Sequence, residues 1–312
     1  MNEVLTRALG VAVVCLLGGI FTPTGPRKPD FQGNWTNGTQ TPLERIIASP
    51  TLTSEEVVVY EAAARRPWTG EMSYDPGLEV LRIGGEARSS IIVDPPDGRI
   101  PPLTDAGKRR VAELTARERK FGEFDHPEVR PLAERCLISF GSNAGPPMLP
   151  NYFYNNNYTI VQTADHVMFL AEMNHDARIV PIGRGSRLPP HIQPWFGDSH
   201  GRWEGATLVV ETTNIRPAQV EQLSRRWPYR GASERLKVTE RFTLSDRDTI
   251  LYRFTLEDPE IFTTPFSGEL VFKRSVEQVF EYACHEGDYS LASILSAARE
   301  RERAAAARTK GP

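Results

Sequence analysis

The stretch LKVTERFTLSDRDTILYRFTL, residues 236–256, decides the fold class of this chain. In its first half Val238, Glu240 and Phe242 fall on one face and the residues between them on the other, which is the period of a β-strand. Residues 245–248, Ser-Asp-Arg-Asp, are a turn signal, and a second β-rich run follows them. The stretch therefore predicts two antiparallel strands joined by a tight turn.

Short β-rich runs of this kind recur through the second half of the chain. They predict about eight strands, at residues 158–162, 166–171, 178–182, 207–212, 236–243, 249–256, 270–273 and 278–284. Shorter strands are expected near 30–36 and 89–93, and helical segments near 53–66, 104–120 and 290–308. Strands at such spacing predict a mainly β fold, an antiparallel barrel or a sandwich with peripheral helices, in one domain over residues 25–312.

Composition narrows the class of protein further. Apolar residues make up 39% and charged residues 25% of the 312 residues, so a wholly disordered chain is excluded. The net charge of -3 gives no basic excess, which a nucleic-acid or anionic-membrane partner would need. The 25 prolines and 24 glycines favour a loop-rich, strand-dominated body over a helix bundle.

The N-terminus contains an uncharged apolar run over residues 8–21. A membrane-spanning helix needs about 20 apolar residues, so this run is too short to be one. It is typical of the apolar region of a signal peptide. We therefore predict that residues 1–24 are a signal peptide, and that the mature protein is periplasmic or secreted and has no membrane span.

Removal of the signal peptide would take Cys15 with it and leave Cys136 and Cys284 as a pair. In an oxidising compartment two such cysteines commonly form a disulfide, and we predict one here. The two cysteines are 148 positions apart in the sequence, and in the chain-entropy model a disulfide that closes so long a loop gives roughly 4–5 kcal/mol of stability. Two buried free thiols are the alternative.

Several segments carry a resemblance to known families. Gly33-Asn34-Trp35 is similar to the G-x-W that opens lipocalins, in which the tryptophan plugs one end of the barrel. More widely, five segments resemble a family of uncharacterised secreted bacterial proteins: residues 29–35, 91–104, 154–167, 195–215 and 282–295. This resemblance spans most of the mature chain and implies one shared fold, but it implies no activity.

The stretch 172–178, Glu-Met-Asn-His-Asp-Ala-Arg, is the first candidate site. Asp176 or Glu172 could orient His175 for acid–base catalysis, and Arg178 could hold a carboxylate or phosphate by two hydrogen bonds. The alternative is a polar loop in which these residues pair locally.

The second candidate site is the stretch 191–205. Asp198, Ser199 and His200 are residue types of a hydrolase triad, but neighbours on a strand face opposite ways. A better interpretation is a pocket rim that combines apolar walls with converging polar groups. Its members would be Trp195, Asp198, His200, Arg202 and Trp203.

A structured turn is the alternative at 191–205. We predict that 172–178 and 195–204 form two walls of one pocket, with His175, Asp176 and His200 as catalytic candidates. The histidines lack a diagnostic metal spacing, so no cofactor or metal is predicted, although a site gathered from distant strands stays open. The asparagine run 155–157 could line a carbohydrate or aromatic ligand site with nearby tyrosines, or could be a loop.

These observations leave three functional hypotheses. The first is an exported protein that binds a small, largely apolar or aromatic molecule inside the barrel. The second is a cofactor-independent lyase, isomerase or hydrolase that uses His175 or His200 with carboxylate and arginine help. The third is a structural envelope protein. Whether the chain is an enzyme is left open by the sequence.

Overall fold

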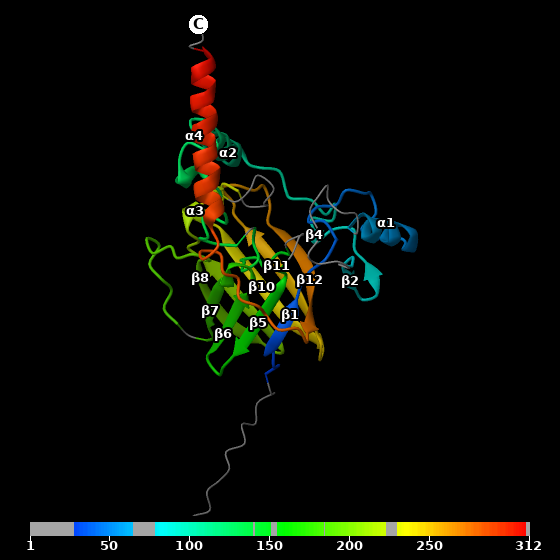
Figure 1. Cartoon of the computed structure of the whole chain (residues 1–312). Helices are drawn as coiled ribbons and strands as arrows, with labels where there is room; N and C mark the ends of the chain where they lie inside the picture. The colour runs from blue at the N-terminus through cyan, green and yellow to red at the C-terminus, as the bar shows by residue number, and fades with distance from the viewer. Residues whose placement is uncertain are drawn as a thin grey trace, which may run out of the picture.

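A large antiparallel β-sheet forms the body of the protein (Figure 1). The structure is a computed structural model that describes residues 28–64, 79–139, 141–150, 155–183, 185–222 and 230–309. The predicted signal peptide, residues 1–24, lies outside the described residues. The strands are β1 (Gly33–Thr36), β2 (Arg82–Ile83), β3 (Glu86–Ala87), β4 (Ile92–Asp94), β5 (Asn157–Gln162), β6 (His166–Ala171), β7 (Ala177–Pro181), β8 (Asp198–Glu204), β9 (Thr207–Thr213), β10 (Lys237–Asp246), β11 (Thr249–Glu257) and β12 (Phe266–Ser275).

Helices lie around the sheet, near the three expected positions and at one more. They are α1 (Ser54–Ala64), α2 (Asp105–Glu118), α3 (Pro217–Gln222) and α4 (Tyr289–Thr309), with short 3₁₀ turns η1 (Pro127–Val129) and η2 (Met173–His175). The helix α4 projects away from the sheet at the end where α2 and α3 lie (Figure 1). Among the described residues, none of the helices combines the length and the apolar character that a membrane crossing requires.

The sheet follows the order β7-β6-β5-β1-β12-β11-β10-β9-β8, and β4 pairs with β12 beside this path. The predicted hairpin is confirmed, because Lys237 on β10 pairs with Glu257 on β11 and Leu244 pairs with Ile250. β8 covers residues for which the sequence predicted a turn or a pocket rim. The fold is thus mainly β and antiparallel.

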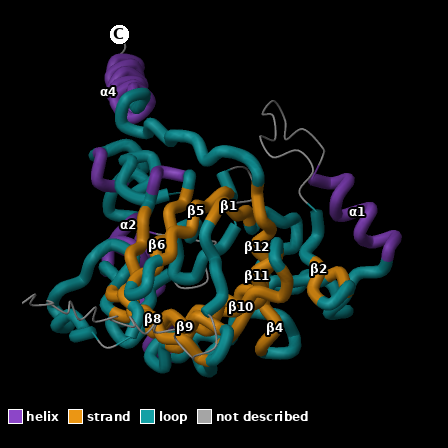
Figure 2. The backbone as a smooth tube through the Cα atoms, turned by 90° about the horizontal axis from the view of Figure 1, so that it is seen from below, coloured by secondary structure: helices purple, strands orange, loops and turns teal. Residues whose placement is uncertain are grey.

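The sheet curls strongly (Figure 2), and its two end strands, β7 and β8, lie side by side (Figure 1). They meet through an isolated parallel bridge between Ile182 and Gly201. The N–H of Gly183 donates to the carbonyl of Gly201 at 2.8 Å. A Cβ atom at position 201 would lie 2.5 Å from Cδ1 of Ile182 and 3.2 Å from Cγ1 of Val180, so a larger residue here would require these side chains to shift.

Aromatic side chains fill the inner face of the sheet. Phe169, Phe242, Tyr252 and Phe272 are each at most 1% exposed. The ring centroids of Phe169 and Phe242 lie 4.8 Å apart, and those of Phe242 and Tyr252 lie 4.9 Å apart. Rings at these separations pack favourably against one another. The inside of the curled sheet is therefore a packed core.

Trp35 on β1 is completely buried, as expected for a tryptophan that seals a core. Its indole N–H donates to the carbonyl of Phe31 at 2.9 Å. The guanidinium of Arg274, on β12, lies 4.2 Å from the centre of the ring. The buried Trp35 ring, whose N–H has a hydrogen-bond partner, therefore closes this end of the core, and the Arg274 guanidinium covers it.

Residues 276–284, which we call the strap, were predicted to contain a strand at 278–284, and that prediction is wrong. Side chains, rather than a neighbouring strand, bind the backbone of the strap. Asn34 donates to the carbonyl of Glu277 at 2.9 Å, and the carboxylate of Glu172 accepts from the N–H of Phe280 at 3.1 Å. The strap ends at Cys284, which forms the predicted disulfide with Cys136.

Candidate functional site

The first candidate stretch, 172–178, connects β6 to β7. Glu172 is buried and accepts hydrogen bonds from the side-chain amides of Asn155 at 2.5 Å and Asn157 at 3.3 Å. Its second carboxylate oxygen binds the strap at Phe280. Glu172 and these asparagines therefore anchor a loop and the strap.

His175 and Asp176 face different partners. The His175 ring is exposed, and its Nδ1 lies 3.1 Å from the carbonyl oxygen of Tyr282 in the strap. Asp176 is buried and accepts from the N–H of Ser139 at 2.7 Å and from Asn174 at 3.0 Å. Burial raises the pKa of the Asp176 carboxyl above its usual value. These hydrogen bonds do not join the two side chains into an acid–base pair.

Arg178 points into the core, where it binds Glu240 on β10. Nη1 and Nη2 of Arg178 lie 2.7 and 3.0 Å from the two carboxylate oxygens of Glu240, and both side chains are at most 2% exposed. The Tyr252 hydroxyl donates to the same carboxylate at 2.8 Å. Burial, with the Glu240 charge beside it, raises the pKa of Tyr252 well above its usual value. The guanidinium of Arg178 is thus already bound to a carboxylate of the protein, that of Glu240.

On β8, Asp198 and His200 form a pair on one side of the strand. Nε2 of His200 lies 3.1 Å from Oδ1 of Asp198, whose other oxygen accepts from the N–H of Leu188 at 3.0 Å. The Ser199 hydroxyl is bonded instead to that of Thr212 at 2.8 Å. The three residues therefore form a histidine–carboxylate pair and not a hydrolase triad.

The remaining predicted residues have separate surroundings. The guanidinium of Arg216 lies 4.8 Å from the ring centre of Trp195, and Trp203 stacks on Phe31 at 5.8 Å. Arg202 is exposed and has glutamate carboxylates 2.7 and 2.8 Å away. β7 and β8 do lie next to each other. The polar side chains of 172–178, however, bond to partners outside 195–204, such as Tyr282 for His175 and Glu240 for Arg178.

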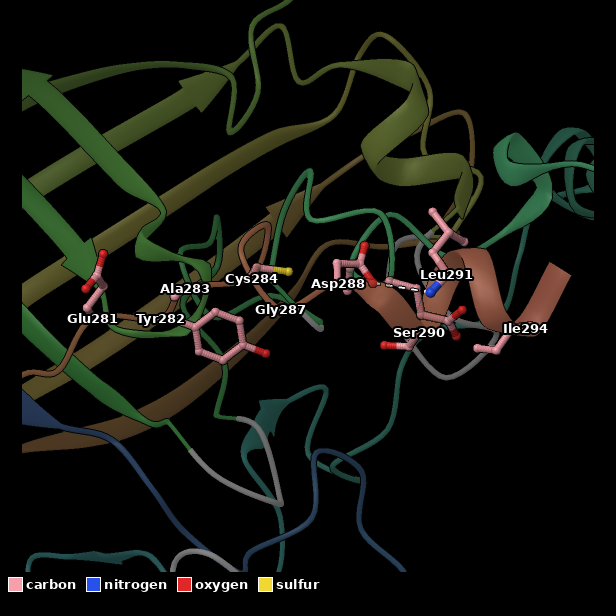
Figure 3. Close-up of a pocket in the computed structure, with 11 residues that line it drawn as sticks. Glu281, Tyr282, Ala283, Cys284, Gly287, Asp288, Ser290, Leu291 and Ile294 are labelled. Carbon is pink, nitrogen blue, oxygen red and sulfur yellow. Dashed lines mark hydrogen bonds between the residues drawn. The ribbon is translucent and has the colours of Figure 1, made fainter. Parts of the chain in front are cut away.

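A cleft lies instead between the strap and the first turns of α4 (Figure 3). Its volume is about 420 Å³, and we call it the strap–helix cleft. None of the eight predicted catalytic and binding residues lines it, although the predicted disulfide does. Its lining residues are Ala133, Glu134, Glu281, Tyr282, Ala283, Cys284, Gly287, Asp288, Ser290, Leu291 and Ile294.

The strap–helix cleft has apolar walls and a few polar groups. Leu291 and Ile294 contribute aliphatic surface from α4, and Tyr282 contributes its ring from the strap. Tyr282 and Ser290 turn their hydroxyl groups toward the gap between them (Figure 3). Oδ1 of Asp288 accepts from the N–H of Leu291 at 3.3 Å, so Asp288 caps the helix. Such a lining is typical of a small-molecule site.

The disulfide holds this arrangement together. Cys284 sits at the end of the strap and is partly exposed, whereas Cys136 is buried. Oδ2 of Asp288 lies 3.7 Å from Sγ of Cys136. The sequence predicted this pairing and the apolar start of α4, and those two signals point to the region of the cleft. They do not give the path of the strap, which forms the other side of the cleft.

A second cleft of about 920 Å³ lies beside α2, η1 and α3. Several of its charged side chains pair with one another: Arg117 binds Glu221 at 2.7 Å and Arg130 binds Glu123 at 2.9 Å. It also adjoins Arg230, which follows a segment outside the described residues. It therefore carries no site here.

Within the described ranges, no group of three or more His, Cys, Asp or Glu side chains is placed to hold a metal ion. No family model, curated protein or solved structure matches the chain. The functional argument therefore rests on the geometry of the residues.

Proposed function

We propose that this chain is an exported small-molecule-binding protein and that the strap–helix cleft is its ligand site. The observation that carries the proposal is the cleft itself, with its volume of about 420 Å³ and its mixed lining. Ligand sites have volumes of roughly 300–1,000 Å³, largely apolar walls and a few placed polar groups. The apolar or aromatic ligand predicted from the sequence suits these walls.

This site replaces the interior of the sheet, where the sequence placed the ligand. Aromatic rings and the Arg178–Glu240 pair occupy that interior. A ligand could enter only by displacing them, and disrupting a packed core costs several kcal/mol. The cleft needs no such rearrangement.

Export is supported by the apolar run at 8–21 and by the disulfide. Disulfides persist in oxidising compartments and are rare in the cytosol. We infer a periplasmic or secreted location, with residues 1–24 removed as a signal peptide. The disulfide would then secure the strap, and with it the cleft, in that compartment.

We also infer that the sheet closes as a lipocalin-like barrel. The support is the contact between β7 and β8 at Ile182 and Gly201, together with the sealed end at Trp35. Hydrogen exchange tests this closure, because the Gly183 amide should be protected like the amides of central strands. An amide that exchanges at the rate of a free loop would contradict closure.

A fluorescence titration with N-phenyl-1-naphthylamine, a neutral apolar probe, tests the ligand site. The mature protein should bind it saturably at one site. The variant Ala283→Trp places an indole in the cleft and should weaken binding at least about tenfold. Ala292→Trp, on the exposed surface of α4 outside the cleft, is the matched control and should bind normally.

Two outcomes would refute the ligand site. One is that the wild-type protein does not bind the probe at all. The other is that both tryptophan variants bind as tightly as the wild-type protein, which would place the probe elsewhere.

The His200–Asp198 pair supports a second candidate function, general-base catalysis. A carboxylate 3.1 Å from the imidazole would orient the ring for proton transfer. Hydrolysis of p-nitrophenyl acetate tests it, with His200→Ala expected to lose the activity above buffer. The control is His166→Ala, because His166 is exposed and also lies 3.0 Å from an aspartate, Asp165. Equal activity in the two variants would remove this candidate.

A further inference from the structure

We propose that the strap–helix cleft selects an organic cation with an apolar body. This inference rests on the proposed function and concerns the charge of the ligand. The charged side chains that line the cleft are Glu134, Glu281 and Asp288. All three are carboxylates, and among the described residues that line the cleft there is no lysine, arginine or histidine.

The three carboxylates are not equally available. Glu134 is already engaged by Arg130, whose Nε and Nη2 each donate to it at 2.9 Å. Glu281 is exposed at the strap side of the cleft (Figure 3). It adds a negative charge to the lining of the cleft.

Asp288 supplies the directed group. One of its oxygens accepts from the N–H of Leu291. The other lies 3.7 Å from Sγ of Cys136, which as a disulfide sulfur has no proton to donate. A ligand ammonium would supply the missing donor, and hydrogen bonds between charged groups are the strong ones.

The apolar walls complete the preference. The aromatic face of Tyr282 would attract a cation, and Leu291 and Ile294 would cover the rest of the ligand. The amino end of α4 alone would favour an anion, but the carboxylate of Asp288 caps that end and offsets its partial charge. An anionic ligand would meet unbalanced carboxylates, and a neutral one would gain only the apolar contact.

Three probes of one shape test the inference: 4-phenylbutylamine, 4-phenyl-1-butanol and 4-phenylbutyrate. Their Kd values are measured by ligand-observed NMR titration of the mature protein with its disulfide intact. We expect the amine to bind at least about tenfold more tightly than the alcohol, a difference of about 1.4 kcal/mol. The carboxylate should bind most weakly.

Charge-removing variants then locate the preference. Asp288→Asn keeps a good helix cap and removes the charge, so the amine should bind as weakly as the alcohol, whose own Kd should not change. Glu281→Gln should reduce the difference in the same direction. Glu286→Gln is the control, because Glu286 is exposed near the cleft but does not line it.

The outcomes separate the two proposals. Equal Kd values for amine and alcohol, both weakened by Ala283→Trp, would overturn the charge preference and leave the cleft as a ligand site. Tighter binding of 4-phenylbutyrate would also overturn it. If none of the three probes binds, the ligand site fails and the inference fails with it.

Discussion

Replacing Arg178 by methionine tests whether this residue belongs to the core or to a ligand site. The change removes the guanidinium and leaves the carboxylate of Glu240, which is completely buried, without its cation. Breaking a buried ion pair in this way costs about 3–5 kcal/mol. Glu240→Gln should cost a similar amount, because it leaves the buried Arg178 charge without its anion.

The double variant Arg178→Met/Glu240→Gln should recover most of this loss. The amide carbonyl introduced at position 240 can still accept the Tyr252 hydroxyl proton, so no buried hydroxyl is left without a partner. Replacing both members of a buried pair is often neutral or stabilising, and we expect the double variant within about 2 kcal/mol of the wild-type protein. The coupling energy of the cycle should then be at least about 4 kcal/mol.

Urea unfolding of the four proteins, followed by circular dichroism with the disulfide intact, measures these free energies. If the single variants do not fold, recovery of a cooperative transition in the double variant still reports the coupling. Refutation would be a loss below about 1 kcal/mol in Arg178→Met, or additive losses in the double variant. A loss of ligand binding at unchanged stability would return Arg178 to the role of a binding residue.

Four further predictions concern stability and processing. Trp35→Ala should cost about 3–5 kcal/mol in a urea melt, and a loss below about 1 kcal/mol would mean that the core is not sealed there. Thiol titration of the denatured, unreduced mature protein should find Cys136 and Cys284 oxidised, and two free thiols would contradict the disulfide. Burial raises the pKa of Asp176, so this carboxyl ionises at lower pH in the unfolded state than in the folded state. The unfolding free energy of the wild-type protein, measured relative to that of Asp176→Asn, should therefore fall as pH rises from about 3.5 to 7. A rise over that range would contradict the prediction. Mass spectrometry of protein expressed from the full chain in a Gram-negative host should show a mature form lacking residues 1–24, and an intact N-terminus in the periplasm or medium would contradict the signal peptide.

Alternation along the chain predicted most of the sheet, because a half-buried strand leaves a clear period of two. β10, β11 and β6 fall close to the residues expected of them. β8 was missed because most of its residues, Asp-Ser-His-Gly-Arg-Trp-Glu, are polar and show no apolar alternation, although the strand pairs with β9 along its whole length. The sequence predicts a strand at 278–284 because the strap is rich in strand-forming residues, but a local pattern does not record which atoms its backbone binds.

The candidate site was harder to predict for a related reason. A period of two places Arg178 on the inner face of β7, but its partner, Glu240, is 62 positions away. Polar residues that are neighbours in sequence were expected to act together, whereas most of them bind distant elements. The residues of the cleft are ordinary in sequence, and only the path of the strap brings Tyr282 and Ile294 into the lining of one cleft.

The disulfide also decides how the protein would respond to being pulled. It closes a covalent ring between Cys136 and Cys284, 148 positions apart, and this ring contains every strand from β5 to β12. Tension applied between the two ends of the chain would enter through β1 and leave through α4, crossing from one cysteine to the other through the sulfur–sulfur bond. The strands inside the ring would bear none of that tension along their own backbone, and about 500 Å of extended chain would stay unreleased. Two strands of the large sheet that lie outside the ring would then bear the load: β1, held between β5 and β12, and β4, which pairs with β12 alone. Pulling β1 out of the sheet would also draw Trp35 from the core.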